Sequence, residues 1–229
     1  MAMPDTPAAP RLKLHYHPLS SFCQKVLVPL YEAGTPFEPV LVNLRNPVER
    51  AALEALWPFA RFPVLEDLGA GRAIPESSII IEYLEQHFPG PAPLIPADPD
   101  LALRVRAQDR FFDIYVHEPM QKITGDRLRP ADARDPYGVE QARARIRTAY
   151  GMIERDMAAK TWAMGETFTL ADCSACPALF YANWVMPVEG EWPNVAAYFD
   201  RLKARPSFAR VIEEAKPYWK YFPREEAAE

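Results

Sequence analysis

The stretch of sequence that decides the fold is LKLHYHPLSSFCQKV, residues 12–26. Its first five residues alternate apolar and polar side chains, which is typical of a half-buried strand. Pro18 ends that strand, and Ser21 and Gln24 then have the spacing of a capping box at the start of a helix. The apolar residues of this helix recur at helical spacing: Phe22, Val26 and Leu30. The stretch therefore predicts a strand followed directly by a helix.

The junction between this strand and this helix suits an anion. The first N–H groups of a helix have no partner within it, and the helix dipole places positive partial charge at the same end. Ser20 and Ser21 add two hydroxyl groups at that point. A thiolate is one of the anions that such a position stabilises.

The residues that flank this stretch predict a β-α-β-α-β-β-α unit, an α/β domain with a mixed sheet. Gly34 ends the first helix, and Pro39 places the second strand at the edge of the sheet. Asn46 caps the second helix, with Pro47 at its first position. Pro63 opens the third strand, a setting that favours a cis X–Pro bond. The predicted elements are 12–16, 21–33, 37–42, 47–56, 62–65, 73–74 and 76–88.

A proline-rich segment divides the chain into two domains. Residues 89–99 contain too many prolines for a helix or a central strand, so we predict a linker there. It separates the α/β domain, at 11–88, from an all-helical domain at 100–229. Residues 1–10 are predicted to be a disordered leader.

The helical domain contains long amphipathic segments. We predict one helix from Asp100 to Ile123, with a kink or break near Pro119. A polar loop at 124–136 and a second long helix at 137–159 follow. The segment Thr169–Asp172 is a capping box ahead of a buried helix. Cys173 and Cys176 on that helix are predicted to pack in the core rather than bind zinc, since they have no companion pair.

Composition excludes several classes of protein. The 229 residues include 26 basic and 31 acidic side chains, a net charge of −5, without a basic stripe that would bind nucleic acid. No apolar run approaches the roughly 20 residues of a membrane span, and the N-terminus has no signal-peptide pattern. The cysteine count of 3 is low and odd, which indicates a reducing compartment. We therefore predict a cytoplasmic protein without membrane or nucleic-acid partners.

The pattern resembles the cytosolic glutathione S-transferase family over residues 12–215. Residues 16–26 (YHPLSSFCQKV) are similar to the start of serine-type members, in which a serine precedes a cysteine or serine and then a basic residue and valine. Residues 58–65 (PFARFPVL) are similar to a segment that binds the cysteinyl part of glutathione through its backbone and a cis proline. The pair Glu76-Ser77 is similar to one that holds the γ-glutamyl group.

The resemblance implies a thioredoxin-like N-terminal domain, an all-helical C-terminal domain and a homodimer. It implies a catalytic role for Ser20 and a glutathione site formed by Arg61, Phe62, Pro63, Val64, Glu76 and Ser77. It also implies that Asp109 reaches the glutathione of a partner subunit. Two departures concern the glutathione pocket: Trp57 replaces the usual asparagine, and Phe62 replaces the usual valine.

Three other residues compete with Ser20 for contact with the sulfur. Ser21 has a spacing to Gln24 that suits a structural cap better. Tyr16 stands where tyrosine-type members keep their hydroxyl, but the Arg-Gly pair that usually follows is absent. Cys23 occupies the second position of a glutaredoxin-like C-x-x-C whose first position is Ser20, so two-cysteine redox chemistry has no first thiol.

The sequence therefore predicts a glutathione transferase, with glutathione as co-substrate and no metal. Lowering a thiol pKa from about 8.5 to about 6.5 takes about 2.7 kcal/mol. One hydrogen bond to a charged acceptor supplies about 1.5–3 kcal/mol and a helix N-terminus about 0.3–1. We expect Phe112, Tyr115 and Trp219 to line the pocket for an apolar electrophile. The alternatives are a non-catalytic binding protein with the same fold and a thiol–disulfide reductase that uses Cys23.

Overall fold

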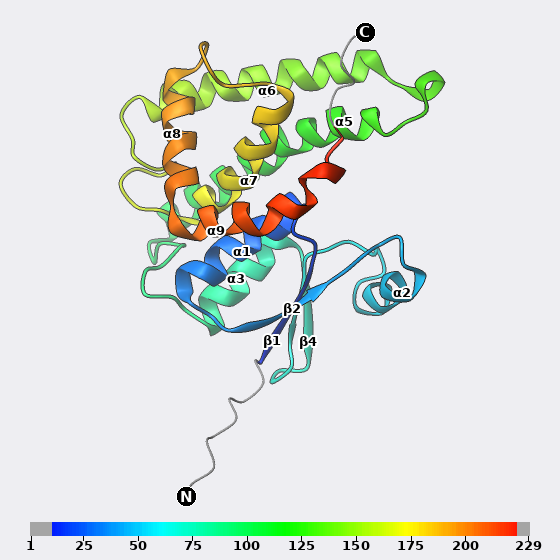
Figure 1. Cartoon of the computed structure of the whole chain (residues 1–229). Coiled ribbons are helices and arrows are strands. Elements are labelled where there is room, and N and C mark those ends of the chain that lie inside the picture. Colours follow the sequence, from blue (N-terminus) through cyan, green and yellow to red (C-terminus); the bar gives the residue numbers. More distant parts are fainter. Residues whose placement is uncertain (1–10, 224–229) are drawn as a thin grey trace, which may run out of the picture.

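The computed structural model describes residues 11–223, so the predicted leader and the last six residues lie outside the described part. Figure 1 shows a small sheet at one end of the molecule and long helices at the other, with α1 (Ser21–Ala33) and α3 (Ser77–His87) between them. The remaining helix of the first domain, α2 (Pro47–Leu56), projects to one side. This is the predicted α/β domain followed by helices.

The sheet is mixed, as predicted. Its strands are β1 (Leu12–Tyr16), β2 (Phe37–Leu41), β3 (Val64–Asp67) and β4 (Arg72–Pro75), in the order β2-β1-β3-β4. The pair β1–β2 is parallel, and β1–β3 and β3–β4 are antiparallel. Because β2 lies at the edge, Pro39 is tolerated there without its N–H. The side chains of Leu12 and Leu14 are fully buried under α1 and α3.

The predicted helix boundaries of this domain are confirmed, but one cap is wrong. Gly34 ends α1 with φ 64°, a left-handed conformation that glycine adopts without strain. Asn46 begins α2 by accepting the N–H of Val48 at 3.0 Å. The cap of α1 is Ser20 rather than Ser21, since Ser20 Oγ accepts the N–H of Cys23 at 3.4 Å. The predicted Ser21 capping box does not form.

Helical elements occupy most of the chain from Pro99 to Tyr221. We predicted that the first segment is one helix ending at Ile123. It instead continues to Arg127 and contains a π-helical segment at Phe112–His117. Pro119 lies just after the π segment, where its missing N–H removes one hydrogen bond from the continuous helix. The elements are α4 (Pro99–Phe111), η1 (Phe112–His117), α5 (Glu118–Arg127), η2 (Ala131–Ala133), α6 (Pro136–Met157), α7 (Leu170–Val185), α8 (Pro193–Ala204), α9 (Pro206–Ala215) and η3 (Lys216–Tyr221).

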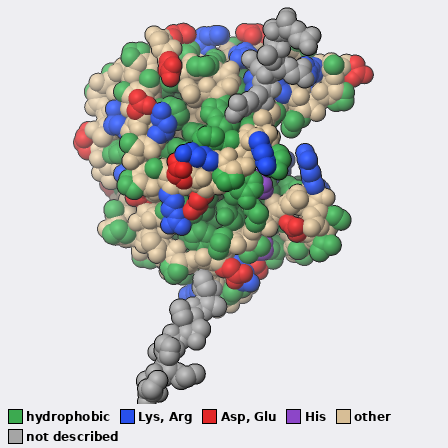
Figure 2. All heavy atoms as spheres, viewed as in Figure 1, with side chains coloured by type: hydrophobic (Ala, Val, Ile, Leu, Met, Phe, Trp, Pro, Cys, Tyr) green, Lys and Arg blue, Asp and Glu red, His purple; other side chains and the backbone are tan. Residues whose placement is uncertain are grey.

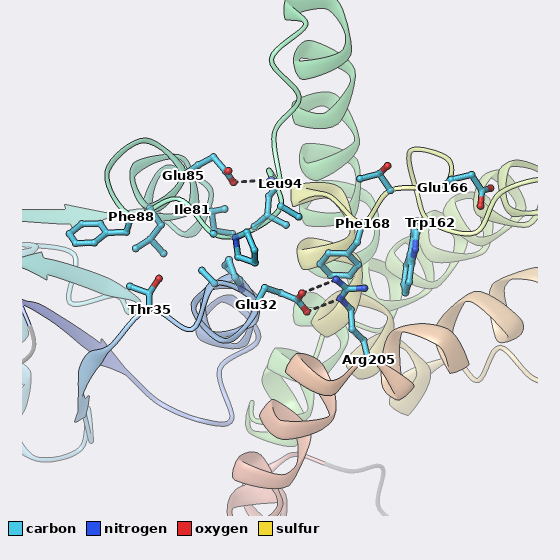
Figure 3. Close-up of a pocket in the computed structure, with 17 residues that line it drawn as sticks. Glu32, Thr35, Ile81, Glu85, Phe88, Leu94, Trp162, Glu166, Phe168 and Arg205 are labelled. Atoms are coloured by element: carbon cyan, nitrogen blue, oxygen red, sulfur yellow. Dashed lines mark hydrogen bonds and ion pairs between the residues drawn. The ribbon is translucent and has the colours of Figure 1, made fainter.

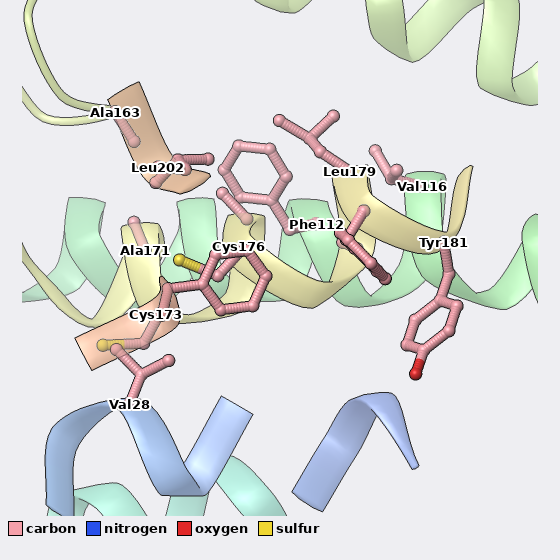
Figure 4. Packing of buried hydrophobic residues seen from close by; sticks show 14 of the residues in the cluster. Val28, Phe112, Val116, Ala163, Ala171, Cys173, Cys176, Leu179, Tyr181 and Leu202 are labelled. Atoms are coloured by element: carbon pink, nitrogen blue, oxygen red, sulfur yellow. The ribbon is translucent and has the colours of Figure 1, made fainter. Parts of the chain in front are cut away.

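Helix α7 forms the centre of the core, because nearly all of its residues are buried. The predicted capping box at its start is confirmed, with the Thr169 and Asp172 side chains each bonded to the other's backbone N–H. Figure 4 shows Cys173 and Cys176 among apolar neighbours from α1 and α8, including Val28 and Leu202. Both cysteines are fully buried, so their predicted role in packing is confirmed. Helix α7 thus packs the two halves of the molecule together.

Candidate functional site

A cleft of ≈ 620 Å³ lies between the β3–α3 region and the junction of α4 with α5. Six residues were predicted to bind glutathione, and five of them line this cleft: Arg61, Phe62, Pro63, Glu76 and Ser77. The sixth, Val64, is fully buried and packs against Val42 and Leu53, so its side chain does not reach the cleft. The cleft therefore brings together two segments that lie apart in the sequence.

The segment before β3 presents backbone to the cleft. The peptide bond between Phe62 and Pro63 is cis, which confirms the conformation favoured by the sequence. Trp57 and Phe62, the two departures noted in the sequence, both line the cleft wall. The volume of ≈ 620 Å³ is that of the cleft with both side chains in its wall, so neither closes it.

Glu76 joins β4 to α3 in an unusual backbone conformation. Its φ is 70° and its ψ 114°, a region that costs a non-glycine residue about 1–3 kcal/mol. Its carbonyl accepts the N–H of Ile80 at 2.8 Å, but its side chain makes no capping hydrogen bond to α3 within the described residues. Ser77 follows as the first residue of α3 and is 7% exposed. The Glu76 carboxylate is thus left for the cleft, so simple capping does not explain this residue.

Ser20 lies at the N-terminus of α1, near the cleft rather than in its wall. Phe22, two residues further on, lines the cleft. Ser20 Oγ accepts the N–H of Cys23 at 3.4 Å. Burial raises the pKa of Cys23 to about 12, so this thiol stays protonated near neutral pH. A hydroxyl that accepts a backbone N–H on its oxygen still carries its own proton to donate.

The structure places the alternatives to Ser20 elsewhere. Ser21 is 7% exposed, and its hydroxyl is hydrogen-bonded to the imidazole of the fully buried His117. Tyr16 lines a separate groove with Tyr31 and Glu214, and burial raises its pKa. Both hydroxyls are therefore turned away from the cleft.

The sequence did not predict the buried ion cluster behind the cleft. Lys25 is 1% exposed, and its Nζ lies 2.7 Å from Asp109 Oδ1, 2.8 Å from Asp113 Oδ2 and 2.9 Å from Ser78 Oγ. These contacts join α1, α3, α4 and the π segment. The only signal in the sequence was the basic residue of the motif at 16–26.

Burial contradicts the roles predicted for Asp109 and Phe112. Asp109 is 2% exposed and bonded to Lys25, so it cannot reach a partner subunit. Phe112 is 1% exposed within the core and offers no surface to an electrophile. Tyr115 is 52% exposed and contacts Phe111, outside the wall of the cleft. Trp219, in η3, packs on Phe180 and Trp184, also away from that wall.

A smaller pocket of ≈ 280 Å³ lies on another side of the molecule, beside α1, α3 and the loop before α7. Figure 3 shows Glu32 and Arg205 pointing toward each other at its edge, with paired contacts of 2.7 Å. The guanidinium also lies 3.8 Å from the centre of the Phe168 ring. These contacts tie α1 to the C-terminal helices, and none of the predicted site residues lies there.

Within residues 11–223, no group of three or more His, Cys, Asp or Glu side chains is placed to hold a metal ion. In the same residues, no helix is both long and apolar enough to cross a membrane.

Comparison with known proteins identifies both halves of the chain. The profile of the glutathione S-transferase N-terminal domain matches residues 14–92, and that of the C-terminal domain matches residues 136–201. A glutathione S-transferase of Pseudomonas putida is 28% identical over 89% of this chain and 92% of its own length.

Two solved structures are similar over nearly the whole chain. The glutathione S-transferase of Methylobacillus flagellatus, with glutathione bound, has a TM-score of 0.81 and 26% identity, covering 87% of this chain and 98% of its own. The glutathione S-transferase of Methylobacterium radiotolerans, in complex with glutathione sulfonate, has a TM-score of 0.76 and 29% identity. The match covers 96% of this chain and 98% of that one.

Proposed function

Because this chain belongs to the glutathione S-transferase family, we propose that it is a glutathione transferase that ionises bound glutathione and directs the thiolate to an electrophilic small molecule. The two solved relatives with glutathione or its sulfonate bound support this choice of co-substrate. Holding thiolate and electrophile together supplies much of the rate, and the protein supplies the ionised nucleophile.

The cleft offers a partner for each part of the tripeptide glutathione. The backbone at Phe62 and Pro63 pairs with the cysteinyl residue. Ser77 and the free N–H groups at the start of α3 receive the γ-glutamyl carboxylate, and the Glu76 carboxylate receives the ammonium group. Arg61, which is exposed at the cleft, pairs with the glycyl carboxylate.

The observation that carries the proposal is the hydrogen bonding of Ser20. Its oxygen accepts the backbone N–H of Cys23, and its proton can be donated to a sulfur at the N-terminus of α1. A hydroxyl that donates to a thiolate in this position stabilises the charged form, and the helix N-terminus adds to the effect. No general base is required.

The kinetic test compares Ser20→Ala with Ser21→Ala. Loss of one charge-assisted hydrogen bond predicts a fall of about ten- to a hundred-fold in kcat/KM for Ser20→Ala with a neutral chloronitrobenzene. Ser21→Ala is the matched control and should lose far less, since that hydroxyl faces His117. Equal losses in the two variants would contradict the role of Ser20.

Two other functions are less well supported. A thiol–disulfide reductase needs an accessible thiolate, whereas Cys23 is fully buried and its pKa is raised to about 12. A non-catalytic binding protein would be retained on immobilised glutathione without turning over any electrophile. The homodimer and the cytoplasmic location stay predictions, and light scattering on the purified chain tests the first.

A further inference from the structure

A second cavity, of ≈ 360 Å³, lies beside the turn that joins β1 to α1. Three separate segments line it: the β1–α1 turn, the β2–α2 loop and η3, through His17, Leu41, Asn43, Arg45, Tyr218 and Tyr221. Figure 2 shows Lys and Arg side chains on both sides of a hollow where α2 and the end of the described chain approach each other. None of the three electrophile residues predicted from the sequence lines this cavity.

His17 connects this cavity to the cleft. Its ring stacks on Phe62 with centroids 6.1 Å apart, and it meets the Tyr218 ring edge-on at 4.9 Å. Phe62 lines the cleft and precedes Pro63, while the His17 carbonyl accepts the N–H of Ser20 at 2.9 Å. His17, which lines the cavity, is therefore three residues before Ser20 and is hydrogen-bonded to it through the backbone. The stacking of His17 on Phe62 also gives a reason for Phe62, since a valine could not stack on the imidazole.

The cavity combines flat apolar surface with hydrogen-bond donors. Tyr218 and Tyr221 supply aromatic rings. His17 Nδ1 accepts the N–H of Leu19 at 3.2 Å, so the neutral ring carries its proton on Nε2. Burial lowers the pKa of His17, which keeps the ring neutral near pH 7.

The charge of the cavity wall is positive. Arg45 is exposed, and within residues 11–223 its guanidinium forms no ion pair. Lys220 lies 5.1 Å from the centre of the Tyr221 ring, next to the rim. No lining residue is acidic. An unpaired guanidinium beside aromatic rings suits a carboxylate on a planar ring.

Resting on the proposed function, we propose that this cavity binds the electrophile and selects aromatic electrophiles that carry a carboxylate. The aromatic ring lies against Tyr218 and Tyr221, the carboxylate pairs with Arg45, and the reacting carbon faces the thiolate near Ser20. With a chlorodinitrobenzoate whose chlorine is para to the carboxylate, the thiolate forms a C–S bond at the chlorine-bearing carbon. The C–Cl bond breaks and chloride leaves with its electron pair, so no oxidant or reductant is needed.

The test uses this chlorodinitrobenzoate and its neutral carboxamide with the full chain. The wild-type protein should show a kcat/KM ratio of acid to carboxamide that Arg45→Gln lowers by about five-fold, the upper range for an exposed ion pair. Arg50→Gln is the matched control, because Arg50 is paired with Glu54 on α2 and lies outside the cavity wall. It removes the same charge and should leave the ratio unchanged.

Three outcomes separate the claims. An equal ratio in the wild type and in Arg45→Gln, with both probes turned over, would overturn the substrate class and leave the transferase intact. A rise in the KM for glutathione in Arg45→Gln, with no change in the ratio, would assign Arg45 to the glycyl carboxylate and overturn this inference. Turnover of neither probe, with no retention on immobilised glutathione, would instead overturn the proposed function.

Discussion

The hydroxyl oxygen of Ser20 accepts the backbone N–H of Cys23 at 3.4 Å, so Ser20 is the residue that caps α1. Sequence spacing had favoured Ser21 for this cap. In the structure Ser21 points to His117 instead, which leaves Ser20 as the hydroxyl at the open end of the helix. The capping residue and the proposed catalytic residue are therefore the same.

Cys23→Ala should retain most of the kcat/KM for a chloronitrobenzene. Cys23 is fully buried, and the backbone N–H that caps Ser20 does not depend on its side chain. If the wild-type protein reduces a mixed disulfide with glutathione, Cys23→Ala should do so as well. Steady-state kinetics on the two proteins checks this, and loss of a reductase activity in the variant would support the redox alternative.

Lys25→Ala should be strongly destabilising. It leaves the buried carboxylates of Asp109 and Asp113 without their shared cation, and removing one partner of a buried pair costs about 3–5 kcal/mol. Lys13→Ala is the control, because its contact with Glu38 at 3.3 Å is on the surface and contributes about 0–1 kcal/mol. Urea unfolding measures both. Similar free energies of unfolding for the two variants would mean that the cluster does not stabilise the fold.

His117 should make the protein lose stability on mild acidification. Burial, and then the charge of Lys25, lower its pKa to about 3, whereas the unfolded chain has a value of about 6.5. Between these values the unfolded state binds the extra proton, so the free energy of unfolding falls as pH falls below about 6.5, by up to about 1.4 kcal/mol per pH unit. Above that pH the contribution is fully present.

His117→Gln should remove this slope between about pH 6.5 and 4.5, above most carboxylate titration. Chemical unfolding at several pH values, taken as the difference from the wild type, isolates the effect. The exposed His87, replaced in His87→Gln, is the control and should follow the wild-type curve. Because burial also lowers the pKa of His17, a shallower slope should remain in His117→Gln, whereas a slope as steep as that of the wild type would show that another group causes it.

Glu76→Gly should separate stability from binding. Glycine relieves the strain at φ 70°, which offsets its entropic cost, so the free energy of unfolding should change by no more than about 1 kcal/mol. Glutathione affinity should fall, because the carboxylate that meets the ammonium is gone. Calorimetry and urea unfolding measure the two effects. Glu54→Gly, at an ordinary helical position, should destabilise by about 1 kcal/mol with glutathione affinity unchanged.

Local signals in the sequence predicted the parts of the fold that depend on neighbouring residues. Gly34, Asn46 and the Thr169–Asp172 box each act within one turn of chain, and all three cap as expected. The cis bond before Pro63 is of the same kind. Glu76 and Ser77, which come from a separate motif, line the same cleft as Arg61, Phe62 and Pro63.

Features that depend on distant residues were not predictable in this way. Lys25 meets Asp113 across 88 positions of sequence, and no local pattern pairs them. We expected Phe112 to line the electrophile pocket, but it begins a π segment and its side chain is buried in the core. The cavity lined by Tyr218 and Tyr221 combines three separate segments of the chain, so no single segment predicts its lining.

The most direct measurement is the pKa of the glutathione thiol in complex with the protein, followed by the ultraviolet absorbance of the thiolate as pH is varied. We expect the pKa of the bound thiol to lie about two pH units below the ordinary thiol value of about 8.5. In Ser20→Ala the pKa should return most of the way to that ordinary value. A wild-type complex whose thiol ionises at the same pH as free glutathione would contradict this expectation.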